Sequence, residues 1–259
     1  TFDAYVRSWT VVLAILCGLL VLLGVYHVRA LPAGGGAAER HSLRDGLSGL
    51  KEVVGAFFQK KHIWYYLGFI ILYRLGEGFV MKIVPLFLKA DTASGGLGLT
   101  NQQIGLYYGT FGAGAFLLGS LLAGYYIAHR GLRRTLFILC CIFNIPFAVY
   151  ALLAWLQPQS MWIVGGGIVL EYFGYGFGFV GLTLFMMQQV APGRHQMAHY
   201  AFASGIMNLS VMLTGAVSGY LSDALGYGMF FLAVMLATVP AFLVTWFVPF
   251  TYDDKPNDK

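Results

Sequence analysis

Long apolar runs constrain this chain more than any other feature of its sequence. A helix crosses the hydrocarbon core of a bilayer, about 30 Å thick, with about 20 apolar residues. Because the runs are too long for tilted strands and lack strict alternation, they predict transmembrane helices rather than a membrane barrel. Seven runs have the required length, near residues 8–28, 63–88, 103–128, 135–156, 161–187, 200–222 and 228–249.

The composition supports a membrane protein. The chain is 58% hydrophobic and 10% charged, whereas soluble domains carry about 25% charged residues. The net charge of +5 does not indicate a nucleic-acid partner, because the basic residues lie in loops between the apolar runs rather than on one soluble domain. The predicted partners are therefore membrane lipid and a small-molecule substrate, with no nucleic acid.

Basic residues concentrate in alternate loops. Twelve lie in 29–62, 129–134, 188–199 and the tail after 250, whereas the opposite loops hold only Arg7 and Lys89. Loops rich in Lys and Arg stay on the cytoplasmic side. The pattern predicts a multi-pass protein whose first loop and C-terminus, residues 251–259, are cytoplasmic.

The loop 29–62 has an order of its own. After the flexible stretch ALPAGGGAAER, apolar residues recur at helical spacing over 42–61. This pattern predicts an amphipathic helix at the inner membrane surface, within a linker that joins two bundles.

Two short motifs occur twice. LGEGF at 75–79 matches FGYGF at 173–177, and GYYIAHRG at 124–131 matches GYLSDALG at 219–226. Three helices separate each motif from its copy, and an odd number of crossings inverts a unit in the membrane. Residues 63–250 are therefore predicted to form a six-helix transport bundle of two inverted three-helix units. Residues 1–28 are then expected to be the last transmembrane helix of a preceding half, and the chain, which begins at Thr1, to be a fragment.

Three charged residues lie near the middle of their predicted spans. Arg74 and Glu77 are separated by three residues, so they share one helix face, and Glu171 lies in the first span of the second unit. A charge in the bilayer centre costs from about 2.5 to more than 10 kcal/mol. Inverted-repeat carriers place their binding sites at this depth.

The interpretation we favour is that Arg74 attracts a substrate carboxylate or phosphate while Glu77 exchanges a proton. The alternative is an ion pair that neutralises itself and fixes a helix interface. Glu171 has no basic residue on its own helix, so it can carry a proton reversibly; the alternative is a neutral glutamic acid packed against another helix.

Three further residues complete the predicted pathway. Lys82 either lines it or extends to the outer interface. Tyr175 can stack on a sugar face or serve as packing, and Asn208 can hydrogen-bond a substrate or join helices.

An intramembrane enzyme is not indicated. All six histidines fall in loops or at span ends, and no Ser/His, paired-Asp or His-metal cluster lies at depth. The three cysteines show no metal or disulfide spacing. We therefore expect no catalytic residues, no cofactor and no metal.

The segment LYRLGEGF at 72–79, preceded by FFQKKHIW and followed by FLKADTASGGLGLTNQQIGL, resembles the seventh helix and following loop of AmpG-type muropeptide permeases of the major facilitator superfamily. The resemblance implies an all-α integral membrane fold, the C-terminal six-helix half with its inverted 3+3 repeat, plus one preceding transmembrane helix. Arg74 and Glu77 match the family's basic and acidic pair.

The same resemblance implies a proton-coupled symporter that imports an anhydro-muramyl sugar bearing a peptide across the bacterial inner membrane. A missing N-terminal half of the same carrier would then be a partner. Two alternatives stay open: a carrier of another cargo, such as an acyl-coenzyme, sugar or drug, and a membrane sensor that binds without transporting.

Overall fold

A computed structural model describes residues 2–31 and 43–252, with side chains described for 3–31 and 49–252. The chain divides into two compact units, Thr1–Ser48 and Gly49–Lys259. Most of the first unit's described part is α1 (Phe2–Ala30), which is 29 residues long and whose described side chains are exposed. This helix confirms the first predicted span.

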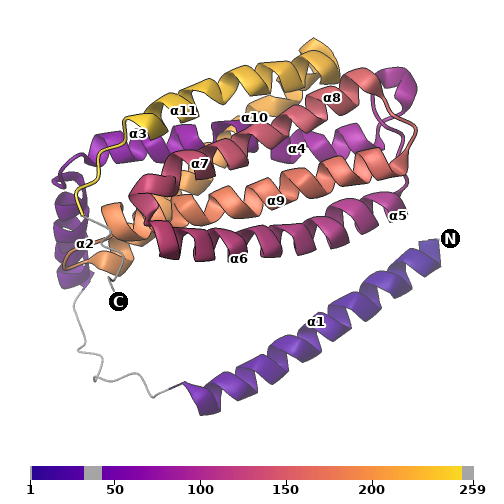
Figure 1. The fold of residues 1–259 in the computed structure, drawn as a ribbon. Helices are drawn as coiled ribbons and strands as arrows, with labels where there is room; N and C mark the ends of the chain where they lie inside the picture. Colours follow the sequence, from indigo (N-terminus) through magenta and orange to yellow (C-terminus); the bar gives the residue numbers. More distant parts are fainter. Residues whose placement is uncertain (1, 32–42, 253–259) are drawn as a thin grey trace. The chain divides into compact units, whose positions relative to one another are not determined.

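The second unit is a bundle of helices that run side by side (Figure 1). All of its described secondary structure is helical, which confirms the predicted all-α class. The elements are α2 (Leu43–Phe58), α3 (Ile63–Tyr73), α4 (Leu75–Lys89), η1 (Thr92–Ser94), α5 (Asn101–Ile104), η2 (Gly105–Phe111), α6 (Gly112–Arg130), α7 (Leu132–Asn144), η3 (Ile145–Phe147), α8 (Ala148–Leu156), α9 (Met161–Phe185), η4 (Met186–Val190), α10 (Gln196–Ala237) and α11 (Val239–Trp246), where α2 begins in the first unit.

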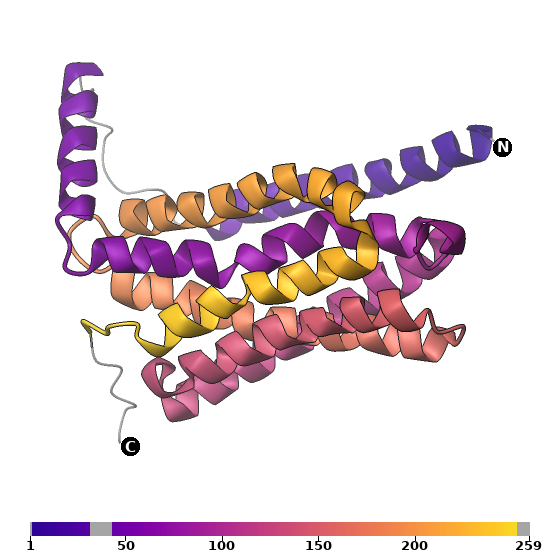
Figure 2. The ribbon, with the colours of Figure 1, turned by 90° about the horizontal axis from the view of Figure 1, so that it is seen from above.

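Five stretches of the described chain are long and apolar enough to cross a membrane, against the seven predicted. Two local features account for the difference. The second predicted span is broken at Arg74 into α3 and α4, and neither piece is long enough alone. The sixth and seventh spans run on as one stretch, Gln196–Trp246, which reverses at Gly226 with φ 71° and ψ 161° (Figure 2). A positive φ of this kind suits glycine, which has no Cβ to clash.

The second glycine of each repeated motif packs in an equivalent place. A Cβ on Gly78 of α4 would overlap Thr214 and approach the backbone of Val211 on α10. A Cβ on Gly176 of α9 would overlap the backbone of Phe116 on α6. Phe116 and Val211 are 95 residues apart, which is the offset between the GYY and GYL motifs. The two helix pairs therefore correspond as an inverted repeat requires.

The first glycine of each motif shows the same correspondence. A Cβ on Gly76 of α4 would overlap the methyl group of Thr238, just before α11. A Cβ on Gly174 of α9 would overlap Ile142 and Pro146, where α7 ends and η3 begins. The first span of each three-helix unit thus packs at this level against the second and third spans of the other three-helix unit. This exchange of contacts supports the predicted 3+3 arrangement.

The predicted linker helix is present as α2. Its part in the bundle unit, from Gly49 to Phe58, lies crosswise to the other helices at one end (Figure 2). Glu52 forms an exposed ion pair of 3.1 Å with Arg194, and the ring of His199 meets the Val53 carbonyl at 3.2 Å. Its place at the inner membrane surface stays a prediction. The linker residues 32–42 and the tail from residue 253 lie outside the described residues.

Candidate substrate and proton site

The break between α3 and α4 builds the centre of the site. Arg74 has φ −100° and ψ 7°, outside helical geometry, so its side chain turns towards the first turn of α4. There its Nε donates to Oε2 of Glu77 and its Nη2 donates to Oε1. Both residues are 4% exposed. The sequence prediction that they meet on one face is thus realised as a buried, two-pronged ion pair, the geometry that a planar guanidinium makes best with a carboxylate.

Neighbouring residues of α9 hold the break in place. The hydroxyl of Tyr73, which is fully buried, donates to the carbonyl of Gly178 at 3.0 Å. The guanidinium carbon of Arg74 lies 5.3 Å from the centroid of the Phe179 ring, within the range of a cation–π contact. Carriers of inverted-repeat type use interrupted helices of this kind to present charge at mid-membrane depth.

Glu171 lies on α9 in a different environment. It is 6% exposed, and its Oε2 accepts a hydrogen bond of 2.8 Å from the hydroxyl of Tyr150 on α8. Within the described part of the chain no basic side chain forms an ion pair with it. The carboxyl group is therefore held by a neutral donor alone.

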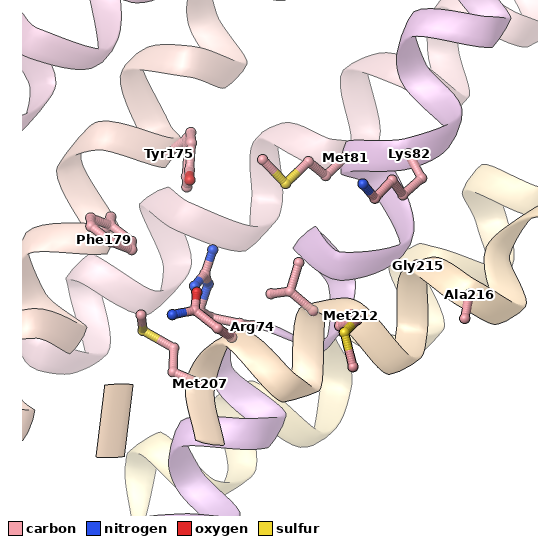
Figure 3. Close-up of a pocket in the computed structure, with 11 residues that line it drawn as sticks. Arg74, Met81, Lys82, Tyr175, Phe179, Met207, Met212, Gly215 and Ala216 are labelled. Atoms are coloured by element: carbon pink, nitrogen blue, oxygen red, sulfur yellow. The ribbon is translucent and has the colours of Figure 1, made fainter. Parts of the chain in front are cut away.

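Two cavities adjoin these groups and share Tyr175 and Met81 in their walls. The larger has a volume of about 630 Å³ and lies between α4, α9 and α10 (Figure 3). The smaller has a volume of about 40 Å³ and contains both Glu77 and Glu171 in its lining. The first is of the size that binds small ligands, and the second is large enough for a single water molecule.

The six residues predicted for the pathway are brought together around these cavities. The larger cavity is lined by Arg74, Lys82, Tyr175 and Asn208, and the smaller by Glu77, Glu171 and Tyr175. Lys82 is exposed and points into the larger cavity beside Met81. Among the described residues, this region thus contains the Arg74–Glu77 ion pair, the cation of Lys82 without an ion-pair partner and the carboxyl group of Glu171 without an ion-pair partner.

Sequence reasoning missed the apolar wall of the larger cavity. Met207, Val211 and Gly215 recur every four residues along α10, so they share one helix face, and Met212 lies beside them in the same wall. This spacing was readable, but an apolar stripe on a transmembrane helix does not by itself distinguish a cavity from lipid. Tyr150 was missed because nothing in its local sequence marks it as a partner of Glu171.

The end of the bundle that carries α2 is tied by polar contacts to the backbone. The Lys60 ammonium donates to the carbonyls of Val190, Ala191 and Pro192 at 2.5, 3.2 and 2.6 Å, where η4 ends. These carbonyls have few partners within their own helix, so a cation there supplies what the helix end lacks.

Gln189 closes the same end. Its side-chain oxygen accepts from the amides of Thr251 and Tyr252 at 2.8 and 3.1 Å, and its nitrogen donates to the Tyr252 carbonyl at 2.8 Å. The segment after α11 is thereby held against η4, so this glutamine serves the fold rather than the cavity.

Most of the chain is similar in sequence to known transport proteins of bacteria. The anhydromuropeptide permease of Escherichia coli (strain K12) is 26% identical over 188 residues, which make up 73% of this chain and 37% of that protein. A putative transporter AmpG 2 of Rickettsia bellii is 24% identical over 195 residues, 74% of this chain and 46% of its own length. The chain thus spans less than half the length of these relatives, and the resemblance to AmpG-type permeases is confirmed.

The sequence model of the family described as Major Facilitator Superfamily matches residues 71–259, which is more than half of the chain. It covers the ion pair, Glu171 and all residues that line the two cavities. Together with the all-helical bundle and the long apolar helices, this match identifies a multi-pass membrane protein of a transporter family rather than an enzyme. The chain belongs to the major facilitator superfamily.

Proposed function

We propose that this chain supplies the C-terminal bundle of a proton-coupled carrier that imports an anionic sugar-peptide across the bacterial inner membrane. The observation that carries the proposal is the buried Arg74–Glu77 pair in the wall between the two cavities. In this scheme Glu77 and Glu171 carry the proton, and Arg74 binds an anionic group of the cargo.

The pair can couple the two movements. While Glu77 is ionised, it occupies two of the guanidinium's donors, and the net charge of the pair is zero. Protonation of Glu77 removes that partner and leaves Arg74 with an uncompensated positive charge at the cavity wall. An anion then binds more tightly, and by thermodynamic linkage a bound anion favours protonation of Glu77 to the same extent. Proton and anion therefore bind together, as symport requires.

Glu171 extends the proton path. Its carboxyl group faces the same small cavity as Glu77, and a single water molecule there would be close to both. Because no basic side chain in the described part of the chain forms an ion pair with Glu171, its ionised form is costly at this depth. In this scheme a proton that leaves Glu77 passes to this carboxyl group across the small cavity that both residues line.

The cargo is inferred from the site and from the relatives. Tyr175 borders both cavities and offers an aromatic surface of the kind that packs on a sugar ring. The name of the Escherichia coli relative specifies anhydromuropeptides, which combine a sugar with a peptide. We place the C-terminus in the cytoplasm because of the positive charge of the alternate loops. We propose that the partner bundle corresponds to the part of these relatives that this chain does not span.

The test uses the full-length protein in liposomes, with a labelled anhydromuropeptide as cargo. Glu77→Gln is expected to lose uptake driven by a proton gradient and to keep exchange of internal for external cargo, which needs no net proton movement. Glu52→Gln is the matched control, because it removes an exposed carboxylate outside both cavities. Undiminished proton-driven uptake by Glu77→Gln would reject the coupling role.

A further inference from the structure

Lys82 is the second cation in the lining of the larger cavity. Within the described part of the chain it makes no hydrogen bond and no ion pair. Arg74, by contrast, is bound at two donors by Glu77. The cavity therefore contains Arg74, which loses its ion-pair partner when Glu77 is protonated, and Lys82, which can bind an anion in either state of Glu77.

The aliphatic part of the Lys82 side chain packs against Gly215 of α10, where the absence of a side chain leaves room for it. A Cβ added at Gly215 would come within 3.0 Å of its Cγ and 3.4 Å of its Cε. The aliphatic part of the side chain therefore lies along the glycine, and the charged end extends into the cavity that both residues line (Figure 3). A larger residue at position 215 would move the lysine.

The two cations are separated along the axis of the second span. Lys82 follows Arg74 by eight residues, and a helix rises by 1.5 Å per residue, which places their α-carbons about 12 Å apart along the helix. Met81, Met207 and Met212 lie in the wall of the same cavity. Methionine is flexible and polarizable, so such a wall accommodates varied apolar and ring surfaces.

We infer that Lys82 forms a second anion subsite, and that the cavity takes an elongated substrate whose two anionic groups are separated on the scale of the two α-carbons, about 12 Å, with a partly apolar body between them. This inference names the substrate class and rests on the proposed function for the movement of that substrate. One anionic group meets Lys82 whatever the state of Glu77. The other meets Arg74 only after Glu77 has taken up its proton, so the second contact is the one coupled to transport.

The test compares two probes on the full-length protein in liposomes and in detergent. One is an anhydromuropeptide with a free C-terminal carboxylate, and the other is the same compound with a C-terminal carboxamide. Lys82→Gln is expected to raise the KM and Kd for the carboxylate probe by about tenfold or more and to leave those for the carboxamide unchanged. Lys82→Arg should retain the preference for the carboxylate, because it keeps the charge.

Two further variants make the result specific. Lys89→Gln removes an exposed lysine at the end of α4, outside the cavity, and should change neither probe. Gly215→Ala should weaken binding of the carboxylate probe by a smaller factor, because it displaces the lysine without removing its charge.

The outcomes separate the two proposals. Equal effects of Lys82→Gln on both probes would overturn the subsite even if the protein transports them. Binding that prefers the carboxylate through Lys82, without uptake of either probe, would support the subsite and reject the carrier. If the wild type binds neither probe, the inferred substrate class is wrong.

Discussion

The hydroxyl of Tyr150 donates a hydrogen bond of 2.8 Å to Oε2 of Glu171, joining the fourth and fifth spans at a buried carboxyl group. Tyr150 is fully buried, and its ring stacks on Phe231 at 5.6 Å between centroids, so the hydroxyl is fixed in direction. Four tyrosines and two glutamates line the small cavity at this point. The bond is therefore the structural link between the proton site and the packing of α8.

Tyr150→Phe tests that link. It leaves a buried carboxyl oxygen without its donor, which costs about 1–3 kcal/mol, so thermal unfolding in detergent should occur at a lower temperature. Combined with Glu171→Leu, which removes the acceptor, the tyrosine change should cost clearly less. Tyr227→Phe is the control, because the Tyr227 ring packs on Phe87 while its hydroxyl has no hydrogen bond among the described residues. Additive effects of the two changes would show that the bond contributes nothing.

The Arg74–Glu77 pair gives a second prediction about stability. Removing one partner leaves a buried charge uncompensated, so Arg74→Met or Glu77→Leu alone should lower the free energy of unfolding by about 3–5 kcal/mol. The double variant should recover most of that loss, because both charges are then absent. Chemical denaturation in mixed micelles measures all three. A double variant as unstable as the sum of the singles would contradict a direct pair and would count against its role as a coupling switch.

Close packing of α9 on α6 depends on Gly176. Because a Cβ there would overlap the backbone of Phe116, Gly176→Ala should cost about 1–3 kcal/mol through overpacking. Gly166 lies on the same helix with no atom within 4 Å of its potential Cβ, so Gly166→Ala should be neutral or stabilising by up to about 1 kcal/mol. Melting temperatures of the two variants in the same detergent check this contrast. Similar values for both would show that the helices separate more easily than the structure indicates.

Lys60 anchors the end of η4 through three backbone carbonyls. A hydrogen bond made by a charged donor contributes about 1.5–3 kcal/mol. Because the three bonds share one ammonium group, we expect Lys60→Met to lower the free energy of unfolding by about this amount in total. Lys61→Met is a control of the same charge change, because the neighbouring lysine is exposed. Thermal unfolding of both variants provides the measurement, and equal melting temperatures would contradict the anchor.

The hydrogen bonds of Gln189 should protect two backbone amides from hydrogen exchange. Its side-chain oxygen accepts from the amides of Thr251 and Tyr252, so Gln189→Leu should raise their hydrogen-exchange rates by about tenfold or more, the equivalent of about 1.4 kcal/mol. Gln188→Leu is the control, since the side-chain oxygen of Gln188 has no hydrogen-bond partner among the residues that the structure describes. Mass spectrometry of the peptide that contains both amides measures the exchange. Unchanged protection in Gln189→Leu would mean that other contacts hold the segment after α11.

The sequence by itself determined the class of fold. The length of the apolar runs and the basic residues in alternate loops reflect the bilayer, which requires helices of a set length and penalises misplaced charge. The two repeated motifs indicated the inverted arrangement of the helices. These local rules were sufficient to find Arg74, Glu77 and Glu171 as buried charges. They also predicted the helix over 42–61, which the structure contains as α2.

Tertiary structure alone decided what each charge touches. The spacing of Arg74 and Glu77 allowed contact, but the break at Arg74 made it two-pronged. Tyr150 lies 21 residues from Glu171 along the chain, and Lys82 lies beside Gly215 of a distant helix. Such partnerships depend on how helices pack at close range, and periodicity along one helix carries no information about the helix that faces it. The sequence therefore predicts which charges are buried, while packing decides which are paired and which are left free to bind.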